Sequence, residues 1–223
     1  MPLSEEKFNQ GMTTQEYIDQ VKVNKQPFVD IYRAVEIPAA TRSFFDGLAE
    51  PLRLAVFTAD WCGDAVSTTP AILRLAESTD RLSVKVFNRD EELALTDGFL
   101  PENRAGTVPV FVVLDLAMNE VARFIETANE LVPAIDAMDE TIAKEVAGET
   151  AEGARTLARG RRTAYRVDQA KEWGQVILGA FRQVVADGLA LPPGSRPAVG
   201  GTKWPPEDQA AGNAAAVPGH PGI

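Results

Sequence analysis

The 223-residue chain has very few residues of the two types that most often bind metals or form cross-links: one cysteine and one histidine. A single cysteine excludes an intramolecular disulfide, and with a single histidine it also excludes the usual Cys/His zinc sites. The histidine, His220, lies near the C-terminal end in a segment rich in proline and glycine, far along the chain from Cys62. This separation argues against a protease-like pair of cysteine and histidine.

The sequence also lacks long apolar runs and an excess of positive charge. No run approaches the roughly 18 apolar residues of a membrane span, and residues 1–14 lack the apolar core of a signal peptide. The formal net charge of −10 gives no global attraction to nucleic acid or anionic lipid. We therefore expect a cytoplasmic protein that binds neither membranes nor nucleic acid, and a single cysteine agrees with a reducing compartment. The oligomeric state stays open.

What the sequence does contain is an alternation of helix and strand patterns. Residues 1–50 are typical of a helical extension, in which Thr13 and Glu16 form a capping box before an apolar stripe. Residues 51–150 then alternate between the two patterns and end with two strands and a helix. The strand patterns are 54–58, 82–90, 107–115 and 121–127, and the helix patterns are 65–78, 91–100 and 130–149. This order predicts an α/β layer with an antiparallel end.

Residues 151–190 predict a helical appendage packed on that layer. Its clearest segment is 173–185, whose apolar residues share one helical face, and Asp187-Gly188 predicts the end of that helix. The remaining residues, 191–223, are rich in proline, glycine and alanine, so they cannot bury enough apolar surface to offset their conformational entropy. We therefore predict that this tail is disordered.

Four arginines of the appendage recur at helical spacing: Arg155, Arg159, Arg162 and Arg166. If residues 154–167 are helical, these arginines line one face, and the segment contains no acidic residue. Such a stripe on an acidic protein could bind a phosphate-bearing partner or an acidic surface of a second subunit. The alternative is a solvated face that pairs with the acidic helix preceding it.

The sole cysteine, Cys62, stands in the sequence ADWCGDA, between an apolar strand pattern and a helix pattern. The triplet WCG at this junction resembles the start of the thioredoxin motif W-C-G-P-C. Pro70 matches the proline that kinks the active-site helix of thioredoxins, and TVP at 107–109 resembles their cis-proline motif. The resemblance to the thioredoxin-like superfamily implies a thioredoxin fold, a central mixed β-sheet flanked by helices, here with an N-terminal helical extension and an extra C-terminal helix.

More narrowly, DWCGDA followed by NRDEE and VPVFVVLD is similar to a bacterial branch in which D-W-C-G-D-[SA] replaces the dithiol motif, and the T-x-x-E-Y of residues 13–17 is similar to it as well. Two departures from thioredoxin matter. Ala65 occupies the position of the resolving cysteine, and Val56 occupies the position where many thioredoxins bury a proton-handling aspartate. The parts needed for a dithiol cycle are therefore missing.

The local sequence around Cys62 contains opposing influences on its reactivity. At the first turn of the predicted helix, the sulfur would face unpaired backbone N–H groups and the positive end of the helix dipole, which lower a thiol pKa. Asp60 and Asp64 push the pKa the other way, because a like charge disfavours the thiolate. An inert, buried small side chain is the alternative interpretation of a lone cysteine, and first-turn charge that complements the dipole is the alternative interpretation of Asp64.

We predict that Cys62 is the catalytic nucleophile. The residues expected to form the substrate-binding groove around it are Trp61, Gly63, Asp64, Val108 and Pro109. The resemblance implies that Pro109 is cis and that the Val108 backbone pairs with an extended partner chain. Attack on a disulfide leaves a mixed disulfide that a second thiol must release. Because Ala65 supplies no thiol, the resolving thiol must come from outside.

Two functions stay open at this point. The first is a monothiol thiol–disulfide oxidoreductase in redox homeostasis. Its partners would be protein or small-molecule thiols and disulfides, and it would need no cofactor beyond a low-molecular-weight thiol as co-substrate. The second is a non-catalytic thioredoxin-fold module that binds a protein segment through a degenerate active site. It is suggested by the missing thiol at Ala65, the missing acid at Val56, and the flanking charges of Asp60 and Asp64.

Overall fold

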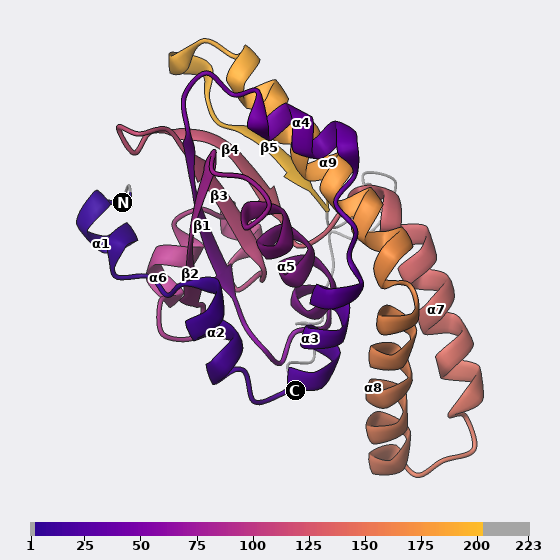
Figure 1. Cartoon of the computed structure of the whole chain (residues 1–223). Coiled ribbons are helices and arrows are strands. Elements are labelled where there is room, and N and C mark those ends of the chain that lie inside the picture. Colours follow the sequence, from indigo (N-terminus) through magenta and orange to yellow (C-terminus); the bar gives the residue numbers. More distant parts are fainter. Residues whose placement is uncertain (1–2, 203–223) are drawn as a thin grey trace.

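The computed structural model describes residues 3–202, which form a five-stranded mixed sheet with helices packed against it (Figure 1). The strands are β1 (Leu52–Thr58), β2 (Leu82–Asn88), β3 (Val110–Leu114), β4 (Glu120–Ile125) and β5 (Ala198–Gly201). Their order is β2-β1-β3-β4-β5; β2 runs parallel to β1, β3 antiparallel to β1 and β4, and β5 parallel to β4. The predicted α/β layer with an antiparallel end is confirmed.

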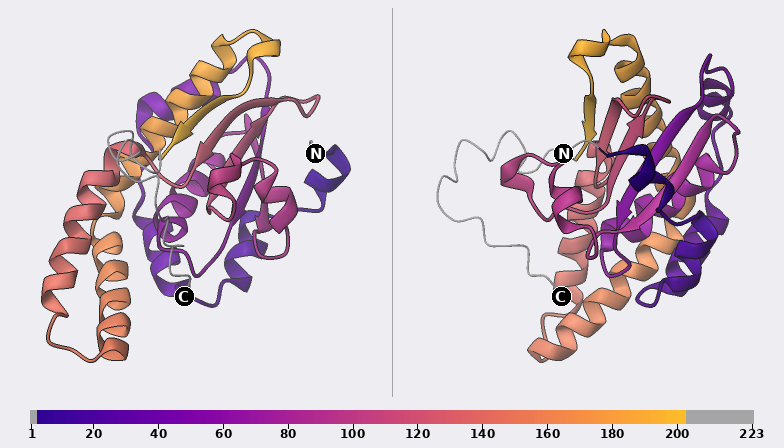
Figure 2. Two further views of the ribbon diagram at one scale, coloured as in Figure 1. Left: turned by 180° about the vertical axis from the view of Figure 1, so that it is seen from behind. Right: turned by 90° about the vertical axis from the view of Figure 1, so that its left-hand side faces the viewer.

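Helices cover both faces of this sheet (Figures 1 and 2). The face that carries the larger apolar cluster packs against α3 (Lys25–Ala34), α4 (Ala39–Asp46), α5 (Gly63–Ala76) and α9 (Ala170–Ala190). The opposite face packs against α1 (Glu5–Asn9) and the segment around α6 (Leu93–Asp97). Short 3-10 helices lie at η1 (Glu102–Arg104), η2 (Asn129–Leu131) and η3 (Pro193–Ser195).

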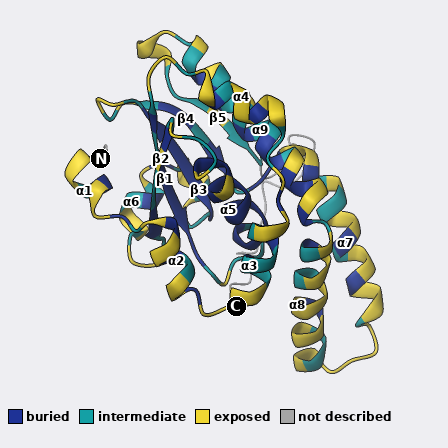
Figure 3. Ribbon diagram, in the orientation of Figure 1, coloured by how far each residue is buried: buried dark blue, intermediate teal, exposed yellow. Residues whose placement is uncertain are grey.

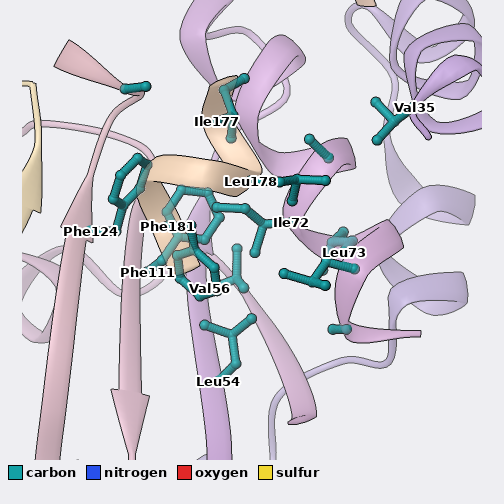
Figure 4. Packing of buried hydrophobic residues seen from close by; sticks show 14 of the residues in the cluster. Val35, Leu54, Val56, Ile72, Leu73, Phe111, Phe124, Ile177, Leu178 and Phe181 are labelled. Atoms are coloured by element: carbon teal, nitrogen blue, oxygen red, sulfur yellow. The ribbon is translucent and has the colours of Figure 1, made fainter. Parts of the chain in front are cut away.

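The period-two alternation of the strands divides the apolar side chains between two clusters. In β1, Leu54 and Val56 belong to the larger cluster, whereas Ala55 and Phe57 face the smaller one, and all four are fully buried. Figure 4 shows the larger cluster, where Phe181 of α9 lies against the aromatic rings from β3 and β4. Burial on both faces explains why the strands read as nearly continuous apolar runs.

The N-terminal extension folds as its sequence predicts. Thr13 accepts a hydrogen bond from the Glu16 N–H at 3.2 Å, and the Glu16 carboxylate accepts one from the Thr13 N–H at 2.7 Å. This capping box starts α2 (Thr14–Gln20). A short bridge between Met12 and Val86 then fixes the extension to the outer strand β2.

Helix α9 is longer than the sequence suggested, because Gly188 does not end it. The helix continues to Ala190 and packs along β4. A Cβ atom at Gly188 would lie 2.1 Å from the Val121 carbonyl oxygen, closer than real contacts allow. Gly188 is therefore required for the close approach of helix and strand, and the prediction of a helix end at Asp187-Gly188 is wrong.

The prediction that disorder begins at residue 191 is also wrong for residues 191–202. This segment forms η3 and then β5, which extends the sheet beside β4. A four-residue strand with two glycines carries no apolar alternation, but it pairs the otherwise open edge of β4. Gly201 has a φ of +95°, and a Cβ atom there would lie 2.1 Å from the Ile125 carbonyl oxygen. The rest of the predicted tail, 203–223, lies outside the described residues.

The helical pair α7 (Val132–Glu145) and α8 (Ala151–Asp168) projects from the sheet layer as a hairpin (Figures 1 and 2). Figure 3 shows that its far end is mostly exposed. Ion pairs between the two helices join Arg162 to Asp139 at 2.6 Å and Arg161 to Glu145 at 3.5 Å. Within residues 3–202, no helix has the length and apolar character needed to cross a membrane.

Candidate functional site

Cys62 lies at the junction of β1 and α5. It is the N-cap residue of α5, with extended backbone angles, and its carbonyl oxygen accepts the Val66 N–H at 3.1 Å. The side chain is a free thiol and is partly buried. A strand that is buried on both faces thus delivers a lone thiol to the N-terminal end of a 14-residue helix.

Val108 and Pro109 lie opposite this thiol, in the loop that leads into β3. The Val108–Pro109 peptide bond is cis, as the resemblance implied. The Cys62 thiol donates a hydrogen bond to the Val108 carbonyl oxygen, with a sulfur-to-oxygen distance of 3.3 Å. Within residues 3–202 the Val108 N–H has no hydrogen-bond partner. The structure therefore brings together the predicted nucleophile and a backbone N–H group that is free to pair.

The environment of Cys62 holds its thiol in the protonated form. Burial raises the pKa of the Cys62 thiol to about 12, and the Asp64 carboxylate raises it as well. The N–H groups of Ala65 and Asp64 lower the pKa, as predicted for a helix N-terminus, but they do not outweigh the loss of hydration. The helix N–H groups and the Asp64 carboxylate thus act on the Cys62 pKa in the two opposing directions that the sequence predicts, and burial makes the net shift upward.

Trp61 forms the exposed rim of the site. The residue is 45% exposed, and its indole N–H donates a hydrogen bond of 2.8 Å to Asp90. Asp90 follows β2 and also lies 3.3 Å from the Arg89 guanidinium. The NRDEE segment thus holds the indole in place beside Cys62.

Asp60 fixes the N-terminal extension to the cysteine loop. Its carboxylate accepts hydrogen bonds from the Lys22 N–H at 2.8 Å and the Val23 N–H at 2.9 Å. Its carbonyl oxygen accepts a further bond of 2.8 Å from the side chain of Asn24, which has the left-handed φ of 55°. Asp60 is not among the groups that shift the Cys62 pKa. Its observed contacts instead hold the loop between α2 and α3.

Gly63 and Asp64 contact the C-terminal hairpin through Arg166 of α8. The Arg166 guanidinium lies 3.1 Å from the Asp64 carboxylate, and a Cβ atom on Gly63 would lie 3.2 Å from that guanidinium. Arg166 is only 7% exposed, although its helix is otherwise largely polar. The structure thus places a buried cation directly against the WCGD turn, a contact that joins residues 102 positions apart.

This contact divides the arginine stripe that the sequence indicated. Residues 154–167 are helical, as expected, but the four arginines do not act as one surface. Arg166 is buried against Asp64, and Arg162 pairs with the preceding helix through Asp139. Arg159 lines an open groove of about 550 Å³ between α3 and α8. Pairing with the acidic helix is thus found for Arg162 alone among the four.

Other residues near the site were missed by sequence reasoning. Glu126, which directly follows β4, raises the Cys62 pKa and pairs with Arg104 at 2.6 Å. Tyr17 of α2 is buried near the site; burial raises the pKa of its hydroxyl, and the charges of Asp60 and Cys62 raise it further against a lowering by Thr58. Only Tyr17 had a sequence signal, the T-x-x-E-Y segment.

The two positions that depart from thioredoxin are both filled by apolar side chains. Ala65 is buried in the first turn of α5, and Val56 is fully buried in the larger core cluster. Neither position offers a second thiol or a buried acid. Among residues 3–202, no three histidine, cysteine, aspartate or glutamate side chains are grouped so that they could hold a metal ion.

A mixed sheet flanked by helices, with a thiol at a helix N-terminus facing a cis-proline loop, defines a thioredoxin-like protein. Residues 11–141 match the family model described as thioredoxin, and the chain belongs to that family. No curated protein matches the chain.

The chain also matches two solved structures. One is a Pseudomonas aeruginosa protein of unknown function, with 16% identity and a TM-score of 0.50, matched over 72% of this chain and 92% of its own. The other is an HIV epitope scaffold, with 14% identity and a TM-score of 0.46, matched over 73% of this chain and 92% of its own. At such identities the first likeness concerns the fold alone.

Proposed function

We propose that this protein is a monothiol thiol–disulfide oxidoreductase, in which Cys62 exchanges with a disulfide and an external low-molecular-weight thiol resolves the product. The observation that carries the proposal is the placement of the Cys62 sulfur 3.3 Å from the Val108 carbonyl oxygen, beside the unpaired Val108 N–H. An extended substrate backbone can pair with Val108 while its disulfide lies against Cys62.

The first step consumes the Cys62 thiol. The Cys62 proton leaves to solvent, and the thiolate attacks one sulfur of a substrate disulfide. A new bond forms between Cys62 and that sulfur, the substrate S–S bond breaks, and the second substrate sulfur departs as a thiolate that takes up a proton. Substrate disulfide is reduced by one thiol equivalent, and Cys62 is oxidised to a mixed disulfide.

The second step needs a thiol that the site does not contain. An external thiolate attacks the substrate sulfur of the mixed disulfide, forms a new disulfide with it and releases Cys62 as a thiolate, which is then protonated. Because Ala65 fills the position from which an internal thiol would attack, the rate of this step depends on the external thiol. If the substrate is a disulfide between a protein and a small thiol, and Cys62 attacks the small-thiol sulfur, the same two steps in reverse attach that small thiol to the protein.

The raised pKa of Cys62, about 12, shapes this cycle. A thiolate of high pKa is strongly nucleophilic but scarce at neutral pH, and it is a poor leaving group. The site disfavours a negative charge on the Cys62 sulfur. The thiol and the mixed disulfide are both uncharged, so the site favours these two forms over the thiolate. The proposed enzyme therefore exchanges slowly and retains its mixed disulfide.

The alternative, a non-catalytic binding module, has less support. Ala65 and Val56 remove the parts of a dithiol cycle but leave a monothiol cycle intact, and Asp60 makes contacts within the fold. No contact among the described residues favours the binding of a protein segment without a reaction at Cys62.

The adduct with glutathione tests the proposal. We expect the folded protein, incubated with oxidised glutathione at pH 8.5, to gain one glutathione per chain by intact mass, and the Cys62→Ser variant to gain none. The same protein in denaturant serves as a control for the chemistry. A folded protein that stays unmodified while the denatured control is fully modified would contradict the proposal.

A further inference from the structure

The buried guanidinium of Arg166 is the one cation that the structure places directly against the WCGD turn in the described part of the chain. It lies 3.1 Å from the Asp64 carboxylate, and a Cβ atom on Gly63 would lie 3.2 Å from it. The arginine side chain is 8% exposed, and its Nε atom is buried without a hydrogen-bond partner among the described residues. Burying an arginine in this way is costly unless its charge is compensated.

Asp64 links this cation to the nucleophile. Its carboxylate is, after burial, the largest influence that opposes ionisation of Cys62. Arg166 is not itself among the groups that shift the Cys62 pKa, so its influence on the sulfur is exerted through the position in which it holds the Asp64 carboxylate, 3.1 Å from the guanidinium. Removing Arg166 would leave a lone carboxylate in the first turn of the cysteine helix.

We propose that Arg166 is a positioning residue for Cys62: by holding the carboxylate of Asp64 from helix α8, it limits how far that carboxylate slows the reaction of the sulfur. The inference rests on the proposed function for its biological meaning, because it names the group that tunes the proposed nucleophile. It also gives the C-terminal hairpin a role, since α8 provides the cation that completes a site built from β1, α5 and the loop before β3.

The other charged and titratable groups near Cys62 do not supply this effect. Glu126, after β4, raises the Cys62 pKa and is itself paired with Arg104. Asp60 accepts two backbone N–H groups of the N-terminal extension. Tyr17 of α2 has a raised pKa and stays neutral near physiological pH. Arg166 is therefore the cation whose removal changes the charge balance beside Asp64.

The test is the pH dependence of Cys62 alkylation by iodoacetamide in matched variants. In Arg166→Gln we expect alkylation to slow by about threefold to tenfold at each pH from 8 to 10, corresponding to roughly half to one pKa unit. Arg166→Lys keeps the charge and should retain most of the rate. The control is Arg162→Gln, on the same helix as Arg166; it breaks the exposed pair with Asp139 of α7 and should leave the rate unchanged.

Asp64→Asn provides the opposite and independent arm. It removes the opposing charge and leaves the Arg166 cation in place, so alkylation should become faster by a similar factor. When Arg166→Gln is added to Asp64→Asn, the slowing measured in the wild-type background should largely disappear if Arg166 acts through Asp64. This arm also tests the proposal if Arg166→Gln alone does not fold.

A purely structural role for Arg166 predicts a different result. Loss of packing would expose Cys62 and make alkylation faster in Arg166→Gln, and either that outcome or an unchanged rate would overturn the proposal. A slower or unchanged rate in Asp64→Asn would overturn it as well. Alkylation reports only on the sulfur, so the proposal can fail while glutathione exchange is observed, and it can hold while exchange is absent.

Discussion

Alkylation of Cys62 by iodoacetamide is expected to speed up by about tenfold for each pH unit between pH 7 and 10, with no plateau in that range. The thiolate is the reactive form, and the Cys62 pKa of about 12 leaves the thiolate fraction proportional to hydroxide concentration throughout this interval. An ordinary cysteine, with a pKa of about 8.5, would approach its plateau above roughly pH 9.5.

The same shift has a consequence for stability, and its sign follows from linkage. The folded-state pKa of Cys62 lies above the value in the unfolded chain, so the protonated thiol contributes fully to stability below the unfolded pKa. That contribution is lost as pH rises through the folded pKa.

The alkylation profile should be measured on the folded protein and on the protein in denaturant. A plateau below pH 9 in the folded protein would contradict the account of a buried, proton-holding site.

The second large effect is expected for Ala65→Cys, which should convert the monothiol site into a dithiol site. Residues three apart in the first turn of a helix have side chains close enough for a disulfide. Under mild oxidation we expect the variant to lose both free thiols to an internal disulfide. Its glutathione adduct should be at least about tenfold shorter-lived than that of the wild type, because an adjacent thiol attacks at a high effective concentration.

Ala71→Cys is the matched control for this variant. Ala71 is also a buried alanine of α5, but it lies nine residues beyond Cys62, roughly 13 Å along the helix, too far for a disulfide. The control should keep its glutathione adduct as the wild type does. Two thiols that stay free in Ala65→Cys, under oxidation that modifies Cys62 in the control, would show that the first turn of α5 lacks the geometry of a thioredoxin site.

The sequence contained enough information to predict the fold and the centre of the site. Buried strands, the position of Cys62 after β1, and the Val108–Pro109 loop all have local signatures: apolar runs, a helix start and an X-Pro dipeptide. Each of these signatures can be recognised from neighbouring residues in the sequence. The contact between Cys62 and Val108 is a tertiary one, and it was predicted from the resemblance to thioredoxin.

The partners of the charged residues could not be predicted in the same way. Arg166 belongs to a stripe of four arginines at helical spacing, and it is the one of the four that is buried, where it contacts Asp64 across 102 positions. The segment that forms β5 was missed for a related reason: its glycines allow close approach to tertiary neighbours, Gly200 to Val184 and Gly201 to Ile125, and they carry no strand pattern.

These contacts also give the DWCGD sequence a structural explanation. Asp60 holds the loop after α2, Trp61 binds Asp90 after β2, and Asp64 binds Arg166 of α8. Each polar residue of the motif thus connects the cysteine turn to a different part of the chain. The aspartates raise the cost of ionising Cys62 or leave it unchanged, while they fix the turn in which the thiol is presented.

The most direct test of a one-thiol cycle is the release of glutathione from the Cys62 mixed disulfide as a function of added reduced glutathione. We predict that release is negligible without added thiol and that its rate rises in proportion to the thiol concentration, with free Cys62 recovered at the end. Release at a rate independent of added thiol, or a mixed disulfide that no concentration of glutathione resolves, would contradict the account.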